Sequence, residues 1–281
     1  MTPAVETVPD RVASLWIGKR LSILEKLCLK SFADVGQTPI LYTYEPLDET
    51  PDYIEWRDAA TIMPLDSTGR IYRDPVNHSP AVHADVFRLN LLHQTDEIWV
   101  DCDAYAVKPF RAKDGYLLCG RRNGRGRLRN GVISLPKDSP ALLNWLAFVR
   151  ETPCVPPWWD PQLKTQYTKL YGSRATFSTL PLGVIGPLAA HYFLTQSGEI
   201  DLTLPEPEYY ALPFSTRLQW FAKDKGQLDV HDWQSKTSIH FFSSVFRTNL
   251  ARRNYQIRRD SFVGRLILKH GLENDPDAIL I

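Results

Sequence analysis

Two carboxylates, Asp101 and Asp103, stand one residue apart directly after a short apolar run, Ile98–Val100. A run of this composition is typical of a buried strand, and in open α/β sheets ligands gather outside the carboxyl ends of the strands. Two hard oxygen ligands at such a position suit a small divalent cation whose other positions hold water and substrate phosphates. The bare Asp-x-Asp pattern is weak, because carboxylates at a strand end are more often solvated turn residues or helix caps. Its interpretation therefore depends on its neighbours.

The segment before this strand carries a second pair of charged residues. Ser79 and Pro80 form an N-cap and first-turn pair for a helix over residues 81–94, whose apolar side chains share one half of the helical wheel at ~100° per residue. Asp85 and Arg88 fall within that apolar half and, three residues apart, face the same way. Three polar side chains occupy the opposite half: His83, Asn90 and Gln94. Because a buried charge must be paired or serve a ligand, Asp85 and Arg88 either form a structural ion pair or line a crevice beside the carboxylate pair.

The elements that position these residues predict an α/β fold. Residues 13–17 form an apolar strand, Ser22 and Glu25 give a Ser-x-x-Glu capping box that begins a helix, Gly36 ends the helix, and residues 40–44 form the next strand. This strand-helix-strand unit indicates a parallel sheet. Further strands are expected at residues 60–63, 116–119 and 131–135, and a helix is expected over residues 140–150.

Length and composition favour one domain spanning residues 1–281, with a less regular second part from about residue 141. The net charge of +1 argues against a protein that coats nucleic acid. The four cysteines form no CxxC pair and no zinc spacing, so we expect reduced thiols in a cytoplasmic protein. No window of about 18 apolar residues indicates a transmembrane helix.

Two basic segments each leave two interpretations open. Residues 121–129 contain five arginines and two glycines, as in a solvated loop or one that contacts phosphates. The run lacks interleaved aromatic residues, which disfavours nucleic acid as a partner. Residues 252–270 include a short amphipathic helix, which either packs on the core or makes a peripheral contact with an anionic membrane.

His240 follows an apolar pair of residues and becomes interesting as a third ligand for a metal at the Asp-x-Asp pattern, since imidazole tolerates manganese. The alternative is a structural histidine. The chain contains no Walker loop, no Gly-x-Gly-x-x-Gly after a strand, no His-Glu-x-x-His and no Gly-x-Ser-x-Gly. Dehydrogenases and P-loop enzymes are thereby disfavoured, and metal-assisted handling of a nucleotide diphosphate remains.

Several short motifs occur in an order that is familiar from one enzyme family. They are Leu15-Trp16-Ile17-Gly18, Ala84-Asp85-Val86-Phe87-Arg88, Trp99-Val100-Asp101-Cys102-Asp103 and Lys108-Pro109-Phe110, with weaker matches at Asn130-Gly131-Val132 and Gly186-Pro187. In these motifs the chain resembles glycosyltransferases with a DXD sugar-binding region, family 32 of the GT-A type. The resemblance covers residues 15–140, about half of the chain. It implies a Rossmann-like, mostly parallel central sheet flanked by helices, with a nucleotide-sugar-binding part over about residues 10–140 and an acceptor-side part over about 141–281.

The resemblance also implies a donor site. Trp16 would stack on the nucleotide base, and the adjacent backbone at Ile17 would bond the edge of the base. Asp85 and Arg88 would contact the donor sugar, and Asn130 would belong to the same donor-binding group. These four motifs together are far more specific than Asp-x-Asp alone.

The same resemblance implies a metal site for Mn²⁺ or Mg²⁺. Asp103 would bind the ion that bridges the diphosphate, Asp101 would face the ribose or a metal-bound water, and His240 would complete the site. The family usually carries a tryptophan a few residues after this histidine. Other residues occupy that stretch here: Ser243, Ser244 and Phe246.

The expected activity is retaining, metal-dependent transfer of a hexose or an N-acetylhexosamine from a UDP-sugar to a saccharide or lipid-linked saccharide, as in bacterial surface polysaccharide assembly. The catalytic group would be Asp85, Arg88, Asp101 and Asp103. Two other classes stay open: a metal-dependent phosphohydrolase with Asp101 as nucleophile, and a non-catalytic carbohydrate-binding protein with a decayed site. The expected location is the cytoplasm, with peripheral contact at the inner face of the membrane as the alternative.

Overall fold

The structure, a computed structural model, describes residues 11–74, 78–120, 128–205, 220–221 and 233–281. Its described part contains a seven-stranded sheet in the order β3-β2-β1-β4-β7-β6-β8. The strands of this sheet are β1 (Val12–Trp16), β2 (Pro39–Thr43), β3 (Glu55–Asp58), β4 (Ile98–Val100), β6 (Leu117–Gly120), β7 (Arg129–Ser134) and β8 (Leu204–Pro205). Pairs β1–β2, β2–β3, β1–β4 and β6–β8 are parallel, whereas β7 is antiparallel to β4 and β6. The prediction of an α/β fold with a mostly parallel sheet is confirmed.

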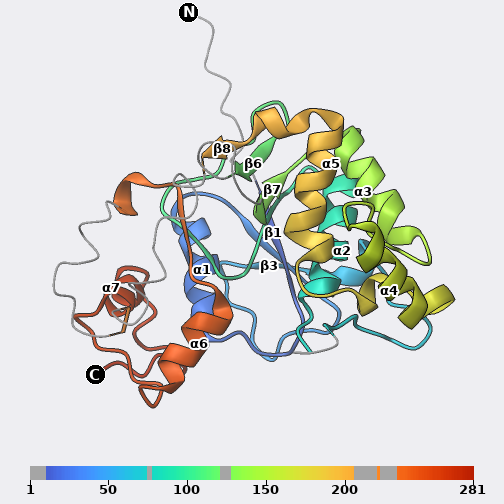
Figure 1. Ribbon diagram of the computed structural model, residues 1–281. Coiled ribbons are helices and arrows are strands. Elements are labelled where there is room, and N and C mark those ends of the chain that lie inside the picture. Colours follow the sequence, from blue (N-terminus) through green and yellow to red (C-terminus); the bar gives the residue numbers. More distant parts are fainter. Residues whose placement is uncertain (1–10, 75–77, 121–127, 206–219, 222–232) are drawn as a thin grey trace, which may run out of the picture.

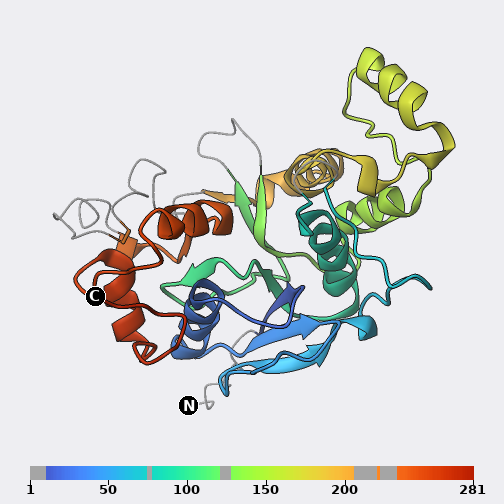
Figure 2. The same cartoon turned by 90° about the horizontal axis from the view of Figure 1, so that it is seen from below.

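Helices cover both faces of this sheet (Figure 1). One side carries α1 (Ile23–Asp34), α6 (Ser243–Ala251) and α7 (Phe262–Lys269). The other side carries α2 (Ala81–Gln94), α3 (Pro140–Arg150), α4 (Pro161–Tyr171) and α5 (Ala189–Ser197). The view from below shows the sheet between the two groups (Figure 2). This arrangement is consistent with the GT-A-like fold that the family resemblance implies.

The two helical layers are held by separate hydrophobic clusters, because successive strand residues point to opposite faces of a sheet. Ala13 and Leu15 of β1 face the cluster formed with α2, α3 and α5. Val12 lies in the cluster on the α1 side. Ser14, the polar residue of the strand, is buried and donates its hydroxyl to the Val100 carbonyl at 2.6 Å. The alternation therefore builds a core on both faces and ties β1 to β4 at the end where the site lies.

Helix α1 begins and ends as the sequence predicts. The Ser22 backbone N–H donates to Glu25 at 2.9 Å, which is the return half of the capping box. Gly36 has a φ of +85°, the left-handed conformation that glycine adopts at helix ends. The first strand-helix-strand unit is therefore confirmed.

The strand expected at residues 60–63 is wrong. Ala59–Thr61 form a 3₁₀ turn, and the strand, β3, lies earlier at Glu55–Asp58. The Asp58 side chain accepts the Ala60 N–H at 2.8 Å and so begins the turn where the apolar pattern suggested a strand. As an edge strand, β3 is half exposed and carries polar residues, which conceals it from an apolar pattern.

Helix α2 differs from its prediction in two details. Pro80 is the N-cap and the helix begins at Ala81, while the Ser79 hydroxyl accepts the Ala81 N–H at 3.2 Å. His83, expected on a polar face, is only 1% exposed and bonds Tyr44 at 2.8 Å. The helix is buried on both sides because the segment before it folds back over its outer face.

The last part of the chain contributes one strand of a second, two-stranded sheet. β5 (Ala104–Ala106) pairs antiparallel with β9 (Ser238–His240), and Ala104 lies opposite His240 in this register. The short strand after the Asp-x-Asp pattern is thus joined to residues more than 130 positions later. This pairing carries His240 to Asp103.

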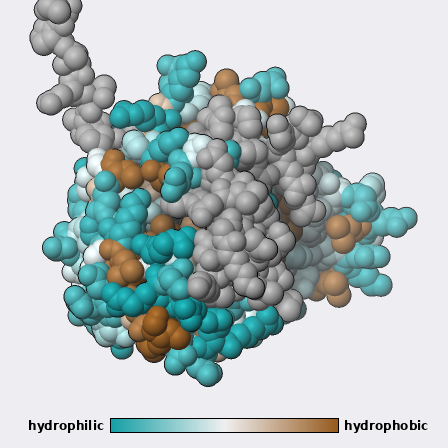
Figure 3. Space-filling model, turned by 90° about the vertical axis from the view of Figure 1, so that its left-hand side faces the viewer, coloured by the Kyte–Doolittle hydropathy of each residue, from teal (hydrophilic) through white to brown (hydrophobic). Residues whose placement is uncertain are grey.

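The amphipathic helix near the C-terminus is α7, and it packs on the core. Its apolar side chains Phe262, Val263, Leu266 and Ile267 are buried in a cluster with α1 and α6. The face on this side of the molecule is mainly hydrophilic, with small separate hydrophobic patches outside the grey atoms (Figure 3). Among the described residues, no helix has both the length and the apolar character needed to cross a bilayer.

Candidate functional site

A cavity of about 770 Å³ opens at the carboxyl ends of β1 and β4. The chain runs from β1 to β2 on one side and later places β4 on the other side, so the strand order reverses between β1 and β4. Crevices at such switch points are where open α/β sheets bind ligands. Trp16 at the end of β1 and Asp101 just after β4 both line the cavity. The topology therefore explains why these two motifs meet.

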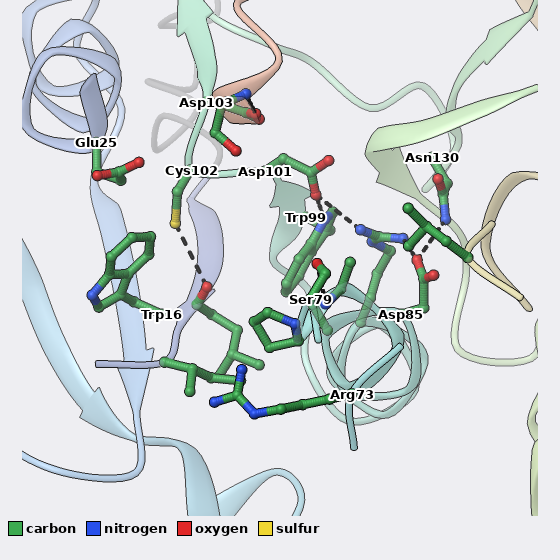
Figure 4. A pocket seen from close by; sticks show the side chains of 18 of the residues that line it. Trp16, Glu25, Arg73, Ser79, Asp85, Trp99, Asp101, Cys102, Asp103 and Asn130 are labelled. Atoms are coloured by element: carbon green, nitrogen blue, oxygen red, sulfur yellow. Dashed lines mark hydrogen bonds and ion pairs between the residues drawn. The ribbon is translucent and has the colours of Figure 1, made fainter. Parts of the chain in front are cut away.

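Arg88 links two of the carboxylates of the cavity. Its Nη1 lies 2.5 Å from Asp85 Oδ1, and its Nη2 lies 2.8 Å from Asp101 Oδ1. The guanidinium carbon lies 4.7 Å from the centre of the Trp99 ring, and the indole N–H of Trp99 also donates to Asp101 at 2.8 Å. Asn130 donates to Asp85 at 3.1 Å (Figure 4). The inward position predicted for Asp85 and Arg88 is confirmed: they form an ion pair, and both line the cavity.

Burial governs the protonation of these carboxylates. It raises the pKa of Asp85, and the Arg88 charge opposes this effect without cancelling it. The pKa of Asp101 is raised by burial in the same way, against the Arg88 charge. Within the described chain, the Nε atom of Arg88 is buried and has no hydrogen-bond partner. Burying these charged groups costs free energy of folding. Such a cost is typical of a site that binds a ligand rather than of a group that stabilises the fold.

Asp103 belongs to a second group. Its Oδ1 lies 2.9 Å from His240 Nε2, and its Oδ2 accepts the Ser243 backbone N–H at 2.6 Å, at the start of α6. Burial alone would raise the pKa of Asp103, but the charge and hydrogen bond of His240, together with backbone hydrogen bonds such as that from Ser243, outweigh burial, so the pKa is lowered. Burial likewise works to lower the pKa of His240, and Asp103 raises it. The two side chains therefore form an ion pair.

Among the described residues, Asp101, Asp103 and His240 form a group that could hold a metal ion. One ligand atom of each lies within 4.8 Å of the other two. The structure thus brings together the three residues that the sequence singled out for a metal, although His240 comes from a distant part of the chain. These three residues lie where β4, β5 and β9 come together.

Trp16 forms the wall on the β1 side (Figure 4), and the next residue, Ile17, also lines the cavity. The Trp16 indole N–H donates to the Arg20 carbonyl at 3.1 Å, which orients the ring. The Arg247 guanidinium lies 5.8 Å from the ring centre and donates at 2.6 Å to Glu25, a buried carboxylate. This wall therefore joins the first strand, α1 and α6.

Gly186 lies against the Asp85 carboxylate. A Cβ atom at this position would meet Asp85 Oδ2 at 2.6 Å, which is closer than real Cβ contacts. Only glycine lets the backbone approach the carboxylate this closely. The motif Asn130-Gly131-Val132 supplies Asn130, and the motif Gly186-Pro187 supplies Gly186. Both residues lie against the Asp85 carboxylate.

Glu25, Arg73 and Arg247 are among the cavity residues that were not predicted as site residues. Glu25 was interpreted only as a helix cap, although the first turn of a helix that follows a parallel strand faces the carboxyl edge of the sheet. Arg73 lies in the polar segment before α2, where the sequence shows no pattern. Arg247 reaches the cavity only through the β5–β9 pairing, so no local signal indicates it. The arginine-rich segment at residues 121–129 was interpreted either as a solvated loop or as one that contacts phosphates, and its residues 121–127 lie outside the described part.

Comparison with known proteins adds little. No family model matches the chain, and no curated protein matches it. Among solved structures the chain is similar to the PaToxG glycosyltransferase, with 13% identity over 87% of this chain and 79% of that chain and a TM-score of 0.43. A similarity at this level carries no functional argument. The site is therefore interpreted from its own residues.

Proposed function

We propose that the chain is a retaining, metal-dependent glycosyltransferase that moves a hexose or an N-acetylhexosamine from a UDP-sugar to a saccharide or glycolipid. One observation carries the proposal. Asp101 and Asp103 line the same cavity of about 770 Å³ as the buried Asp85–Arg88 pair, at the switch point of the sheet, and His240 contacts Asp103. That volume is within the usual range for ligand pockets, about 300–1,000 Å³.

The residues present fit a divalent ion. Two carboxylate oxygens and one imidazole nitrogen within 4.8 Å of one another are a mixed oxygen and nitrogen donor set. Such a set suits Mn²⁺, whereas Mg²⁺ prefers oxygen ligands alone. Asp101, Asp103 and His240 would hold the ion, which would stabilise the negative charge that develops on the leaving phosphate.

Arg88 would act through the carboxylates that it orients. Its two ion pairs hold Asp85 and Asp101 in place from a single guanidinium. Asp85 would accept hydrogen bonds from hydroxyls of the donor sugar, and Asn130 would keep its carboxylate turned toward the cavity. Trp16 offers an aromatic surface for a nucleotide base.

The arrangement of charges favours a front-face reaction. Each cavity carboxylate in the described chain has a partner: Asp85 and Asp101 share Arg88, Asp103 has His240, and Glu25 has Arg247. A double displacement needs a carboxylate that is free to attack the sugar. In the proposed reaction the leaving phosphate accepts the proton of the attacking hydroxyl, so no such carboxylate is required.

The same contacts disfavour the phosphohydrolase hypothesis. Asp101 Oδ1 accepts from both Arg88 and Trp99 at 2.8 Å. The two bonds draw negative charge from the carboxylate as a whole and so weaken Asp101 as a nucleophile. The decayed-site hypothesis differs from the proposal only in predicting no turnover, so the following experiment separates them.

Donor hydrolysis tests the proposal. A panel of UDP-glucose, UDP-galactose, UDP-N-acetylglucosamine and UDP-N-acetylgalactosamine is incubated with the protein and Mn²⁺, and released sugar is measured by NMR, which also reports its anomeric form. We expect turnover of at least one donor with retention. Asp103→Asn should lower it by on the order of 10² or more, as is typical for loss of a charge that acts on the transition state. Asp96→Asn is the control, because Asp96 is exposed and, among the described residues, bonds only Lys137. Turnover that survives both EDTA and Asp103→Asn contradicts the proposal.

A further inference from the structure

A second cavity, of about 430 Å³, lies on the other face of α2. Its floor is apolar and buried, formed by Val86 of α2 and Val149 of α3 together with the His83 ring. Tyr72 stacks on that ring, with 5.6 Å between the ring centres, and forms a wall. An apolar, aromatic floor beneath a polar rim is the usual form of a small-molecule site.

Two arginines from different elements line the rim. Arg70 belongs to the segment before α2, and Arg150 is the last residue of α3. In the described chain neither arginine pairs with a carboxylate, and the Arg70 guanidinium lies 5.8 Å from the centre of the Tyr72 ring. Asp66, also at the rim, turns back: its Oδ1 accepts from Thr68 at 2.6 Å and from the Arg70 backbone N–H at 3.2 Å. The rim therefore offers two guanidinium groups without a carboxylate bound to them.

The two cavities share a wall. Arg70 and Tyr72 line the second cavity, and the next residue, Arg73, lines the first. On α2, His83 faces the second cavity and Asp85 the first. Arg73 also lacks a carboxylate partner in the described chain. It donates at 3.1 Å to a backbone carbonyl and lies across the first cavity from Asp103 in Figure 4.

We propose that the second cavity binds a sugar unit bearing a carboxylate or a phosphate, within an acidic saccharide acceptor whose reacting end lies in the first cavity. The inference rests on the proposed function and names the substrate class of its acceptor. Guanidinium groups bind carboxylate and phosphate oxygens through paired N–H donors, whereas a neutral sugar carries no negative charge for the two arginines to bind. Arg73, which lines the first cavity, adds a third positive charge to those of Arg70 and Arg150 at the second.

The test titrates simple probes into the full chain with Mn²⁺ and UDP present, so that the first cavity is filled. The probes are D-glucuronate, D-glucose 6-phosphate, D-glucose and orthophosphate, and binding is followed by NMR. We expect the two acidic sugars to bind at least about fivefold more tightly than glucose and orthophosphate, the effect of about one exposed ion pair. Arg70→Gln with Arg150→Gln should abolish that preference. Arg174→Gln is the matched control, because Arg174 is exposed and lines neither cavity.

The outcomes distinguish failure of the inference from failure of the proposed function. Acidic sugars that bind no better than glucose overturn the inference, as does a preference that survives the double substitution. Orthophosphate that binds as well as both sugars shows an adventitious anion site only, and also overturns it. UDP affinity in the presence of Mn²⁺ should be unchanged in the double variant. If UDP does not bind the wild-type chain at all, the proposed function fails, while the probe titration without UDP still tests the second cavity.

Discussion

Gly186→Ala tests whether Asp85 is held as tightly as the structure indicates. The new Cβ atom would lie 2.6 Å from Asp85 Oδ2 and 2.9 Å from Asp85 Cγ. Ordinary contact begins at 3.4 Å, so the carboxylate must retreat by 0.8 Å (3.4 − 2.6). Asp85 is 7% exposed and bound to Arg88 and Asn130, so a retreat disturbs both bonds. Overpacking of this kind costs about 1–3 kcal/mol of the free energy of unfolding.

The assay is urea denaturation of a double-mutant cycle that combines Gly186→Ala with Asp85→Ala. Because Asp85→Ala removes the atoms that the new Cβ meets, the two changes should couple by about 1 kcal/mol or more. Gly198→Ala provides the control: its Cβ would meet nothing within 4 Å, so its own cost should add to that of Asp85→Ala. Additivity within about 0.5 kcal/mol between positions 186 and 85 would refute the close approach.

Two further perturbations address protonation and charge in the site walls. Burial, aided by the Arg73 charge, lowers the pKa of His83 to about 4, and the Tyr72 backbone N–H donates to its Nδ1 at 3.3 Å, so the ring is neutral in the fold. Neutral His83 therefore contributes stability that is fully present above pH 6.5 and is lost as the pH falls toward 4, by about 3 kcal/mol in total. Unfolding free energies at pH 7 and pH 4.5 should show a steeper loss for the wild type than for His83→Gln, and equal losses contradict the assignment. Arg88→Lys should cost about 3 kcal/mol in urea denaturation, because one ammonium cannot bridge two buried carboxylates as the guanidinium does. A cost below about 0.5 kcal/mol would show that the bridge contributes little.

The elements that local patterns determine were predictable from the sequence. Helix α1 begins at its predicted capping residues, and α3 begins at its predicted proline. Both starts are determined by residues within the helix or next to it. The inward position of Asp85 and Arg88 also followed from helical spacing, because the period of a helix decides which residues share a face. These are interactions among residues that are close in the chain.

The rest depends on contacts between distant residues, which one sequence does not reveal. β3 escaped prediction because an edge strand needs no apolar alternation. The burial of His83 depends on the segment before α2 folding back over the helix, and Arg247 reaches Glu25 only because α6 packs against α1. The group of Asp101, Asp103 and His240 was expected from a family resemblance, and its proximity comes from the β5–β9 pairing.

Calorimetric titration of UDP into the chain, with Mn²⁺ and again with EDTA, tests the central claim most directly. The account predicts binding that requires the metal and that Asp103→Asn weakens at least about tenfold, as expected when a ligand to a bound metal is lost. The Asp96→Asn control should bind UDP as the wild type does. UDP binding of equal strength with Mn²⁺ and with EDTA, or no binding under either condition, would contradict the claim that this cavity holds a metal-bound nucleotide.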